Sequence, residues 1–100
     1  MTRVPTVEFE LFTSSFCGAC AQTRAVLNRA IRHIPGGAVV SEHDIAFEPD
    51  RAESAGIRVT PTVIVRDADG TEVLRASGIP TIPQVLTAAV RAFDRKENHS

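Results

Sequence analysis

Two cysteines, Cys17 and Cys20, stand three residues apart where a strand-like run of the sequence gives way to a helix-like run. Residues 7–12 alternate apolar and charged side chains, a pattern typical of a strand with one buried face. From about residue 20 to 32, apolar residues recur at helical spacing until Pro35 and two glycines end the run. The first third of the chain is therefore predicted to be a strand, a pair of thiols and a helix.

The two thiols are predicted to differ in chemistry because they occupy different places at the start of that helix. Unpaired backbone N–H groups and the positive end of the helix dipole stabilise a thiolate there, so its pKa falls below the ~8.5 of a free cysteine. Cys17 comes first and is expected to be the exposed, attacking nucleophile, whereas Cys20 is expected to be shielded and to resolve the mixed disulfide. The Gly18-Ala19 spacer is small and leaves the sulfurs uncovered, and hydroxyls at positions 13–15 are available to cap the helix.

A metal site and inert packing are the alternatives for this cysteine pair. Two cysteines three apart can form half of a zinc site, but a structural zinc ion needs four ligands. The chain has two cysteines in total, and His33, His43 and His99 lack ligand spacing to them. Redox chemistry is therefore favoured over a metal site or packing thiols, and neither a metal nor a cofactor is expected.

Length and composition predict a single globular domain over residues 1–100, with a core of about 6–95. The chain is 43% hydrophobic and 23% charged, and its net charge of −1 gives no reason to expect nucleic acid or a membrane surface as a partner. No apolar run is long enough to span a membrane, and residues 1–5 lack the apolar core of a signal peptide. A cytoplasmic monomer is the expectation, and in that compartment a cysteine pair is more often catalytic than structural.

The rest of the sequence predicts three more strands and two more helices. Strands are expected over about 38–45, 60–66 and 71–76, and helices over about 50–55 and 82–95. The first two strands flank a helix and should be parallel, and the last two should form a hairpin. The predicted fold class is α/β in the order β-α-β-α-β-β-α, a four-stranded mixed sheet with helices on both faces. The apolar residues expected on the inner face of the last helix are Val85, Leu86, Ala89, Val90 and Phe93.

A set of short motifs, in this order of elements, resembles the thioredoxin superfamily, and most of all the short, glutaredoxin-like thioredoxins. The similarity covers about residues 6–95. The resemblance implies a thioredoxin fold in which the Thr60–Pro61 peptide bond is cis and the proline faces the two sulfurs. The matching motifs are Glu10-Leu11-Phe12-Thr13-Ser14, Phe16-Cys17-Gly18-Ala19-Cys20, Asp44-Ile45 with Glu48-Pro49, Gly56-Ile57-Arg58-Val59-Thr60-Pro61-Thr62, and Gly78.

Three positions depart from the pattern of standard thioredoxins. Phe16 stands where those proteins have tryptophan, and Ala19 stands where they have proline. Leu11 takes the place of a buried acid, six residues before the first cysteine, that is thought to relay protons to the inner thiol. Glu10 is adjacent but should point to the opposite face of the strand, where a solvated side chain is the simpler interpretation. Water and Glu10 are therefore both candidates for handling the Cys20 proton.

The resemblance implies a thiol–disulfide oxidoreductase that reduces protein disulfides through a redox-active Cys17/Cys20 disulfide. Its partners would be disulfide-containing proteins and an electron donor like thioredoxin reductase. The residues expected to shape the substrate-docking surface surround the cysteines and the proline, and they are Phe16, Gly18, Ala19, Val59, Thr60, Pro61, Thr62 and Gly78.

Two alternative functions remain open. One is a glutathione-linked, glutaredoxin-like enzyme, and glutaredoxins bind glutathione through a lysine upstream of the cysteines and a Gly-Gly after the last strand. No lysine precedes Cys17 in this chain, and Ser77-Gly78 stands where the Gly-Gly would be, so this alternative is less favoured. The other is a thioredoxin-fold adaptor that binds a partner while its cysteines stay idle.

Overall fold

The computed structural model describes the backbone of residues 6–97 and the side chains of residues 6–93. The ends of the predicted domain, at residues 1–5 and 98–100, lie outside this described part. The elements follow the predicted order, with boundaries close to the predicted ones. They are β1 (Val7–Thr13), α1 (Gly18–Ala30), the 3₁₀ turn η1 (Ile31–His33), β2 (Ala38–Asp44), α2 (Pro49–Ser54), β3 (Thr62–Arg66), β4 (Glu72–Ser77) and α3 (Ile82–Glu97).

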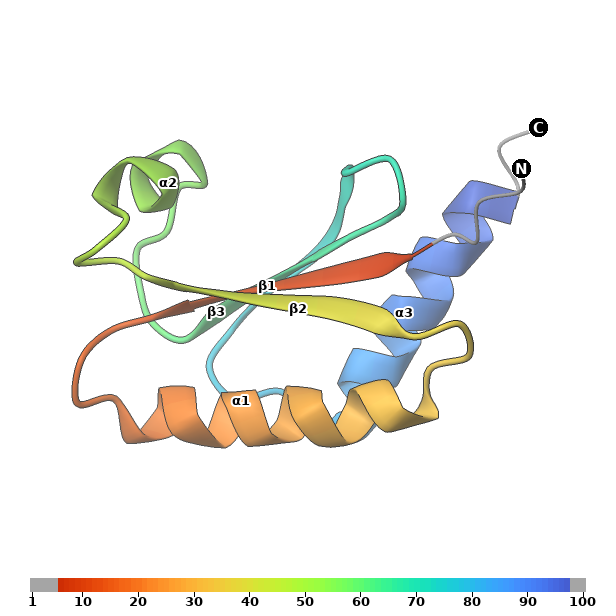
Figure 1. Cartoon of the computed structure of the whole chain (residues 1–100), viewed down its shortest axis with the longest axis horizontal. Coiled ribbons are helices and arrows are strands. Elements are labelled where there is room, and N and C mark those ends of the chain that lie inside the picture. The colour runs from red at the N-terminus through yellow and green to blue at the C-terminus, as the bar shows by residue number, and fades with distance from the viewer. Residues whose placement is uncertain (1–5, 98–100) are drawn as a thin grey trace.

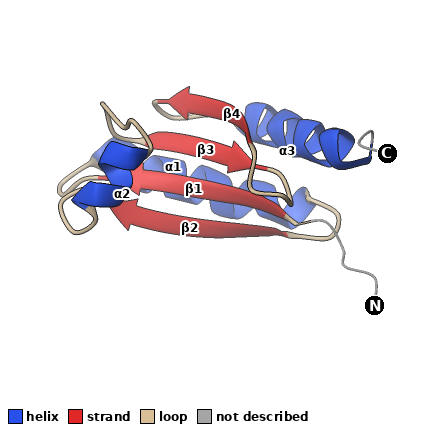
Figure 2. Ribbon diagram, turned by 90° about the horizontal axis from the view of Figure 1, so that it is seen from above, coloured by secondary structure: helices blue, strands red, loops and turns tan. Residues whose placement is uncertain are grey.

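The strands form one mixed sheet in the order β2-β1-β3-β4. β1 and β2 are parallel, whereas β1 pairs with β3, and β3 with β4, in antiparallel fashion. Figures 1 and 2 show α2 on one side of this sheet and α1 on the other, with α3 packed beside α1. The predicted fold class, a four-stranded mixed sheet with helices on both faces, is confirmed.

The larger hydrophobic core lies between the sheet and the two long helices, α1 and α3. Phe9 and Leu11 of β1 are fully buried in it, together with Leu27 of α1, and Val63 and Val85 join them from β3 and α3. Burying a large aliphatic or aromatic side chain of this kind stabilises the fold by about 1.5–3 kcal/mol. This core holds α1, and with it the cysteine pair, against the sheet.

The opposite face of the sheet has a smaller apolar cluster under α2. Phe12 of β1 and Ile64 of β3 meet Ala52 of α2 there. Strand residues alternate between the two faces, so Glu10 also lies on this side, as predicted. Its side chain is not solvated, however, because it is buried against charged partners from neighbouring elements.

The start of α1 differs from the prediction. The helix begins at Gly18, and its N-cap residue is Cys17 rather than one of the hydroxyl residues at 13–15. Of those, Thr13 is buried at the end of β1 and Ser14 is hydrogen-bonded to Thr60 across the chain. A sulfur therefore takes the capping position that the sequence had assigned to a hydroxyl.

The inner face of α3 also corrects one prediction. The buried stripe consists of Val85, Ala88, Ala89 and Ala92, which recur at the i, i+3, i+4, i+7 spacing of one helix face. Val90 falls outside that stripe and is 56% exposed, so its expected place in the core is wrong. The sequence favoured the larger apolar residue, but the face turned to the core carries three alanines beside Val85.

Candidate active site

The topology brings four connecting segments to one edge of the sheet. The parallel strands β1 and β2 both end there, β4 ends there too, and β3 begins there. Figure 1 shows the β1–α1 loop, the β2–α2 loop and the segment before β3 at the same end of the molecule. This edge therefore collects the cysteine motif, the proline motif and the residues after β4.

Cys17 and Cys20 form a disulfide across the first turn of α1, with their Cα atoms 5.2 Å apart. Cys17 is half-buried, whereas Cys20 is only 1% exposed, which matches the predicted difference in accessibility. The Cys17 sulfur accepts a hydrogen bond from the Cys20 backbone N–H at 3.0 Å. In the reduced protein the same N–H group and the helix dipole would stabilise a thiolate at Cys17.

The proline motif is tied to the cysteine loop and to the end of β4 by hydrogen bonds. The Thr60–Pro61 peptide bond is cis. The hydroxyl groups of Thr60 and Ser14 lie 2.7 Å apart and share a hydrogen bond, and Ser14 belongs to the loop that leads to Cys17. The backbone N–H of Gly78 donates to the Pro61 carbonyl at 2.9 Å. Three segments far apart in the sequence are thereby held together at the edge of the sheet.

The predicted docking residues divide into exposed and buried ones. Phe16 is fully exposed and Val59 is 53% exposed. Pro61 and Thr62 are buried, and the Thr62 hydroxyl donates to the Val59 carbonyl at 2.7 Å, so Thr62 supports the loop from below rather than lining its surface. Of the other predicted docking residues, Gly18 is exposed, and the half-buried ones are Ala19, Thr60 and Gly78.

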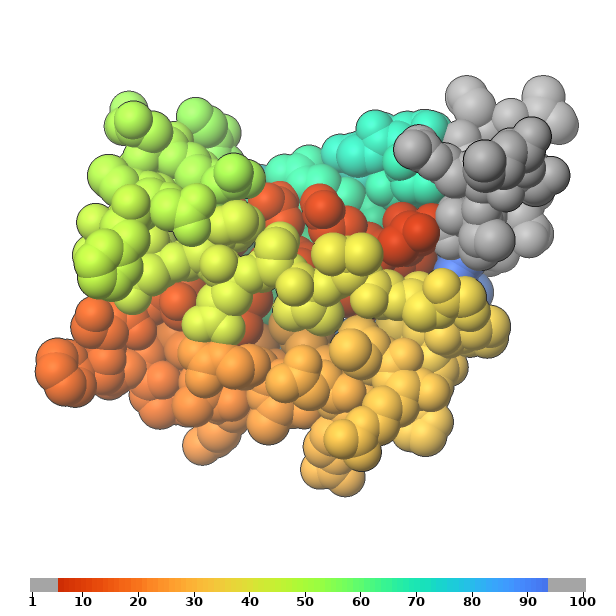
Figure 3. All heavy atoms as spheres, viewed as in Figure 1, coloured from red at the N-terminus to blue at the C-terminus, as the bar shows by residue number. Residues whose placement is uncertain are grey.

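Phe16 has an unusual backbone conformation directly before the first cysteine. Its φ angle is 56°, in the left-handed region that bulky residues rarely adopt. Its side chain lies outside the hydrophobic core and is fully exposed to solvent. In Figure 3 the orange-red atoms of the segment between β1 and α1 form a projection at this end of the molecule. Such outliers concentrate at functional sites, where the surrounding structure holds them.

Two residues of this edge were missed by sequence reasoning. Ser14 was predicted to offer a helix-capping hydroxyl, and its contact with Thr60 spans 46 residues, so no local pattern reveals that contact. Phe47, in the β2–α2 loop, is 83% exposed at the same end of the sheet as Phe16. The signal for Phe47 was its place just after the second of two parallel strands, whose ends share one edge.

Neither Leu11 nor Glu10 presents a carboxylate to Cys20 on the α1 face of the sheet. Leu11 is fully buried in the apolar core and has no acid–base chemistry. Glu10 lies on the α2 face, where its carboxylate accepts a hydrogen bond from Arg66 at 2.7 Å, whereas Cys20 belongs to α1 on the other face. Glu10 and Cys20 therefore lie on opposite faces of the sheet, which leaves water as the acceptor proposed below.

Within residues 6–97, no group of three or more histidine, cysteine or acidic side chains is placed to hold a metal ion. No helix of that same part of the chain is long and apolar enough to cross a membrane.

Comparison with known proteins points to thioredoxins. No family model matches the chain. Its sequence is similar to a thioredoxin of Methanocaldococcus jannaschii, with 29% identity over 59 residues that cover 59% of this chain and 69% of that protein. The structure is similar to chloroplastic thioredoxin z, with a TM-score of 0.78 and 21% identity over 89% of this chain and 80% of that one. A mutant thioredoxin from Halobacterium salinarum gives a TM-score of 0.76 and 22% identity over 86% of this chain and 74% of that one.

These similarities agree with what the geometry of the site allows. A disulfide-bonded cysteine pair at the start of α1, in a chain similar to thioredoxins, supports a thioredoxin-like redox function. The four-stranded sheet and the placement of its helices are common to this chain and its structural relatives. By that architecture, the chain has the fold of the thioredoxin superfamily.

Proposed function

We propose that this protein is a thiol–disulfide oxidoreductase that reduces disulfide bonds of other proteins. One observation carries the proposal: the half-buried Cys17 sulfur sits over the start of α1, accepts the Cys20 N–H, and is disulfide-bonded to a buried Cys20. This arrangement provides one accessible, activated thiol and one protected thiol. Those are the two components that a two-step exchange requires.

The proposed reaction transfers two electrons from the dithiol to the substrate. The Cys17 thiolate attacks one sulfur of the substrate disulfide, so a Cys17–substrate bond forms and the other substrate sulfur leaves as a thiolate. Cys20 then loses its proton to water and attacks the Cys17 sulfur, which releases the second substrate thiolate and closes the Cys17–Cys20 disulfide. A dithiol reductase of the thioredoxin-reductase type is proposed to restore the reduced form.

The surface around the cysteines suits a protein substrate better than glutathione. Phe16, Phe47 and Val59 expose large apolar side chains at the redox edge of the sheet, and aromatic residues of this kind commonly anchor protein–protein contacts. Pro61 and Gly78, joined by a hydrogen bond, are proposed to form the floor of the docking surface. The lysine through which glutaredoxins bind glutathione has no counterpart before Cys17.

Reduction of insulin, followed by turbidity, tests the proposal directly. With NADPH and thioredoxin reductase, the protein is expected to accelerate insulin reduction, and Cys17→Ser should abolish that turnover. Acceleration only in the presence of glutathione and glutathione reductase would favour the glutaredoxin-like alternative. If the folded protein is inactive in both assays, the adaptor alternative replaces the proposal.

The direction of electron flow is tested by the reduction potential of the Cys17–Cys20 couple. A value of about −270 mV, as in reducing thioredoxins, fits the proposal, whereas a value of about −120 mV is typical of oxidants that introduce disulfides. Equilibration against glutathione redox buffers, with alkylation of free thiols, measures it. We also propose that the protein carries out this reaction as a monomer in the cytoplasm.

A further inference from the structure

Residues 58–60 form a short segment, between α2 and β3, that carries part of the proposed docking surface. Val59 in this segment is 53% exposed. Within residues 6–97, the backbone N–H groups of the segment donate no hydrogen bond. The Val59 carbonyl accepts the Thr62 hydroxyl, but Thr62 is only three residues away, so this bond shapes the turn without joining it to another part of the molecule. A segment with so few backbone hydrogen bonds depends on other contacts for its position.

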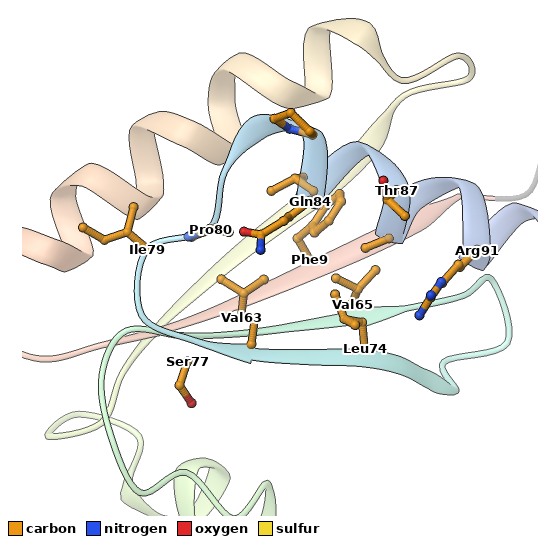
Figure 4. Close-up of a pocket in the computed structure, with 14 residues that line it drawn as sticks. Phe9, Val63, Val65, Leu74, Ser77, Ile79, Pro80, Gln84, Thr87 and Arg91 are labelled. Carbon is orange, nitrogen blue, oxygen red and sulfur yellow. The ribbon is translucent and has the colours of Figure 1, made fainter.

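The chain that follows this segment is held by the core. Figure 4 shows Val63 and Val65 of β3 pointing toward α3, and both are buried in the larger hydrophobic core. Pro61 is buried too, and its carbonyl accepts the Gly78 N–H at 2.9 Å. Val59 is not part of this core, so the packing that fixes β3 does not by itself fix the segment before it.

Ser14 is the residue that joins the segment to a distant part of the chain. The Ser14 and Thr60 hydroxyls lie 2.7 Å apart, the usual length of an O–H···O hydrogen bond. Ser14 directly follows Thr13, the last residue of β1, which is 4% exposed and whose carbonyl accepts the Ile45 N–H at 2.9 Å. One end of the hydrogen bond is therefore fixed to the sheet, and the other end holds the segment 58–60.

We propose that Ser14 is a positioning residue for protein substrates, because its hydroxyl holds Thr60, and with it Val59, where a protein docks. The inference rests on the proposed function and adds a residue to it. Within the described residues Ser14 makes no hydrogen bond to Cys17 or Cys20, so it acts through Thr60. Loss of its hydroxyl should therefore weaken the docking of a protein and leave the chemistry of Cys17 unchanged. A small disulfide makes few contacts with the docking surface, so the two classes of substrate separate these effects.

Single-turnover oxidation of the reduced protein by two substrates tests the proposal. The reduced protein is mixed with an excess of insulin, or of 2-hydroxyethyl disulfide as the small substrate. Acid quenching, alkylation and mass spectrometry of the protein then give a second-order rate constant for each. Ser14→Ala should slow the reaction with insulin about fivefold, the factor expected for one lost hydrogen bond, and leave the reaction with the small disulfide unchanged. Ser14→Thr keeps the hydroxyl and should restore the native rate with insulin.

Two further variants show whether the hydrogen bond itself is responsible. Ser15→Ala is the matched control, since Ser15 is exposed and has no hydrogen bond within the described residues, and it should change neither rate. Thr60→Val removes the partner hydroxyl. Ser14→Ala should have no further effect on the insulin rate when Thr60 is already replaced by valine, because both substitutions break the same bond.

Three results would overturn the proposal, and one of them concerns the proposed function as well. Equal slowing of Ser14→Ala with both substrates means that Ser14 shapes the cysteine site rather than the docking surface. An unchanged insulin rate in Ser14→Ala means that the hydrogen bond does not position the segment 58–60. If the native protein reacts with the small disulfide but not with insulin, the proposed function fails and the inference about Ser14 fails with it.

Discussion

Leu11 and Glu10 are neighbours on β1, yet they point into two different environments. Leu11 enters the continuous apolar core under α1 and α3, whereas Glu10 enters a cluster of polar and charged groups under α2. In that cluster the Glu10 carboxylate lies 2.7 Å from Arg66 of β3, 3.5 Å from Arg51 of α2 and 3.4 Å from His43 of β2. The face that carries the cysteines is thus held by apolar packing, and the opposite face is held partly by charge.

Because the two faces are held by different interactions, the attachment of α1 to the sheet should respond to other changes than the attachment of α2. Apolar packing has no titrating group and is not weakened by charge screening, so we expect the attachment of α1 to depend less on pH and ionic strength than that of α2. α2 has only six residues and one buried residue, Ala52, so its attachment relies more on the charged groups. A change on one face should therefore leave the chemistry of the other largely intact.

Leu11→Asp should disrupt the apolar core under α1 and α3, and we expect it to lower the free energy of unfolding more than the other substitutions. A buried carboxylate with no partner costs several kcal/mol, and the packing of the leucine is lost as well, so we expect at least about 3 kcal/mol of destabilisation at pH 7. Urea denaturation followed by circular dichroism measures it.

The pH dependence of that variant separates charge from packing. Burial raises the folded-state pKa of the new carboxyl group above its unfolded value, so the destabilisation should shrink as the pH falls from 7 toward 5. Leu11→Asn has no charge to titrate and is the control. If the two variants lose the same stability at every pH, position 11 is not the dry environment described here.

Glu10→Gln should weaken the charged face by a smaller amount. The substitution removes a charge-assisted hydrogen bond to Arg66, and Arg66 can still reach solvent, so about 1–2 kcal/mol is expected. Glu8→Gln, on the same strand and face, is the matched control because Glu8 has no ion pair within the described side chains, and it should cost less than about 0.5 kcal/mol. Insulin reduction by the Glu10 variant should match the native rate; a marked loss of activity would mean that the two faces are coupled.

Arg24→Gln should have the smallest effect, and that effect should depend on pH. The Arg24 guanidinium makes two hydrogen bonds to Glu42, both 2.6 Å long, and holds the pKa of that carboxyl group below its ordinary value of 4.5. A lowered folded-state pKa gives stability that is present above the unfolded pKa and is lost as the pH falls through the folded pKa. Because the pair is well exposed, its contribution is below about 1 kcal/mol.

The measurement for this pair is the free energy of unfolding between pH 6 and pH 3. The native protein should lose more stability over that interval than Arg24→Gln, since the variant has already lost the interaction. Parallel curves for the two proteins would show that the ion pair contributes nothing in solution.

The fold was largely predictable because its elements have strong local patterns. The alternation in β1 and the helical spacing in α1 both follow from one buried face. The cysteine motif also predicted that the first thiol is more exposed than the second, and Cys17 is half-buried whereas Cys20 is fully buried.

What the sequence did not reveal depends on partners that are distant along the chain. Glu10 is buried rather than solvated because Arg66, 56 residues later, reaches it. Ser14 supports the proline loop rather than the helix because Thr60 lies beside it only in the folded chain. Val90 is exposed because the helix face that meets the core carries Val85 and three alanines, and Val90 lies outside that face. The Glu10 and Ser14 cases are tertiary contacts that no local pattern of residues specifies.

The central claim is that Cys17 attacks and Cys20 resolves, and the alkylation rates of the two thiols in the reduced protein test it most directly. Iodoacetamide at pH 7, with the modified peptides quantified by mass spectrometry, gives a rate for each cysteine. We predict that Cys17 reacts at least about tenfold faster, because it is the more exposed sulfur and its thiolate is stabilised by the helix N-terminus. Equal rates, or faster labelling of Cys20, would contradict the account.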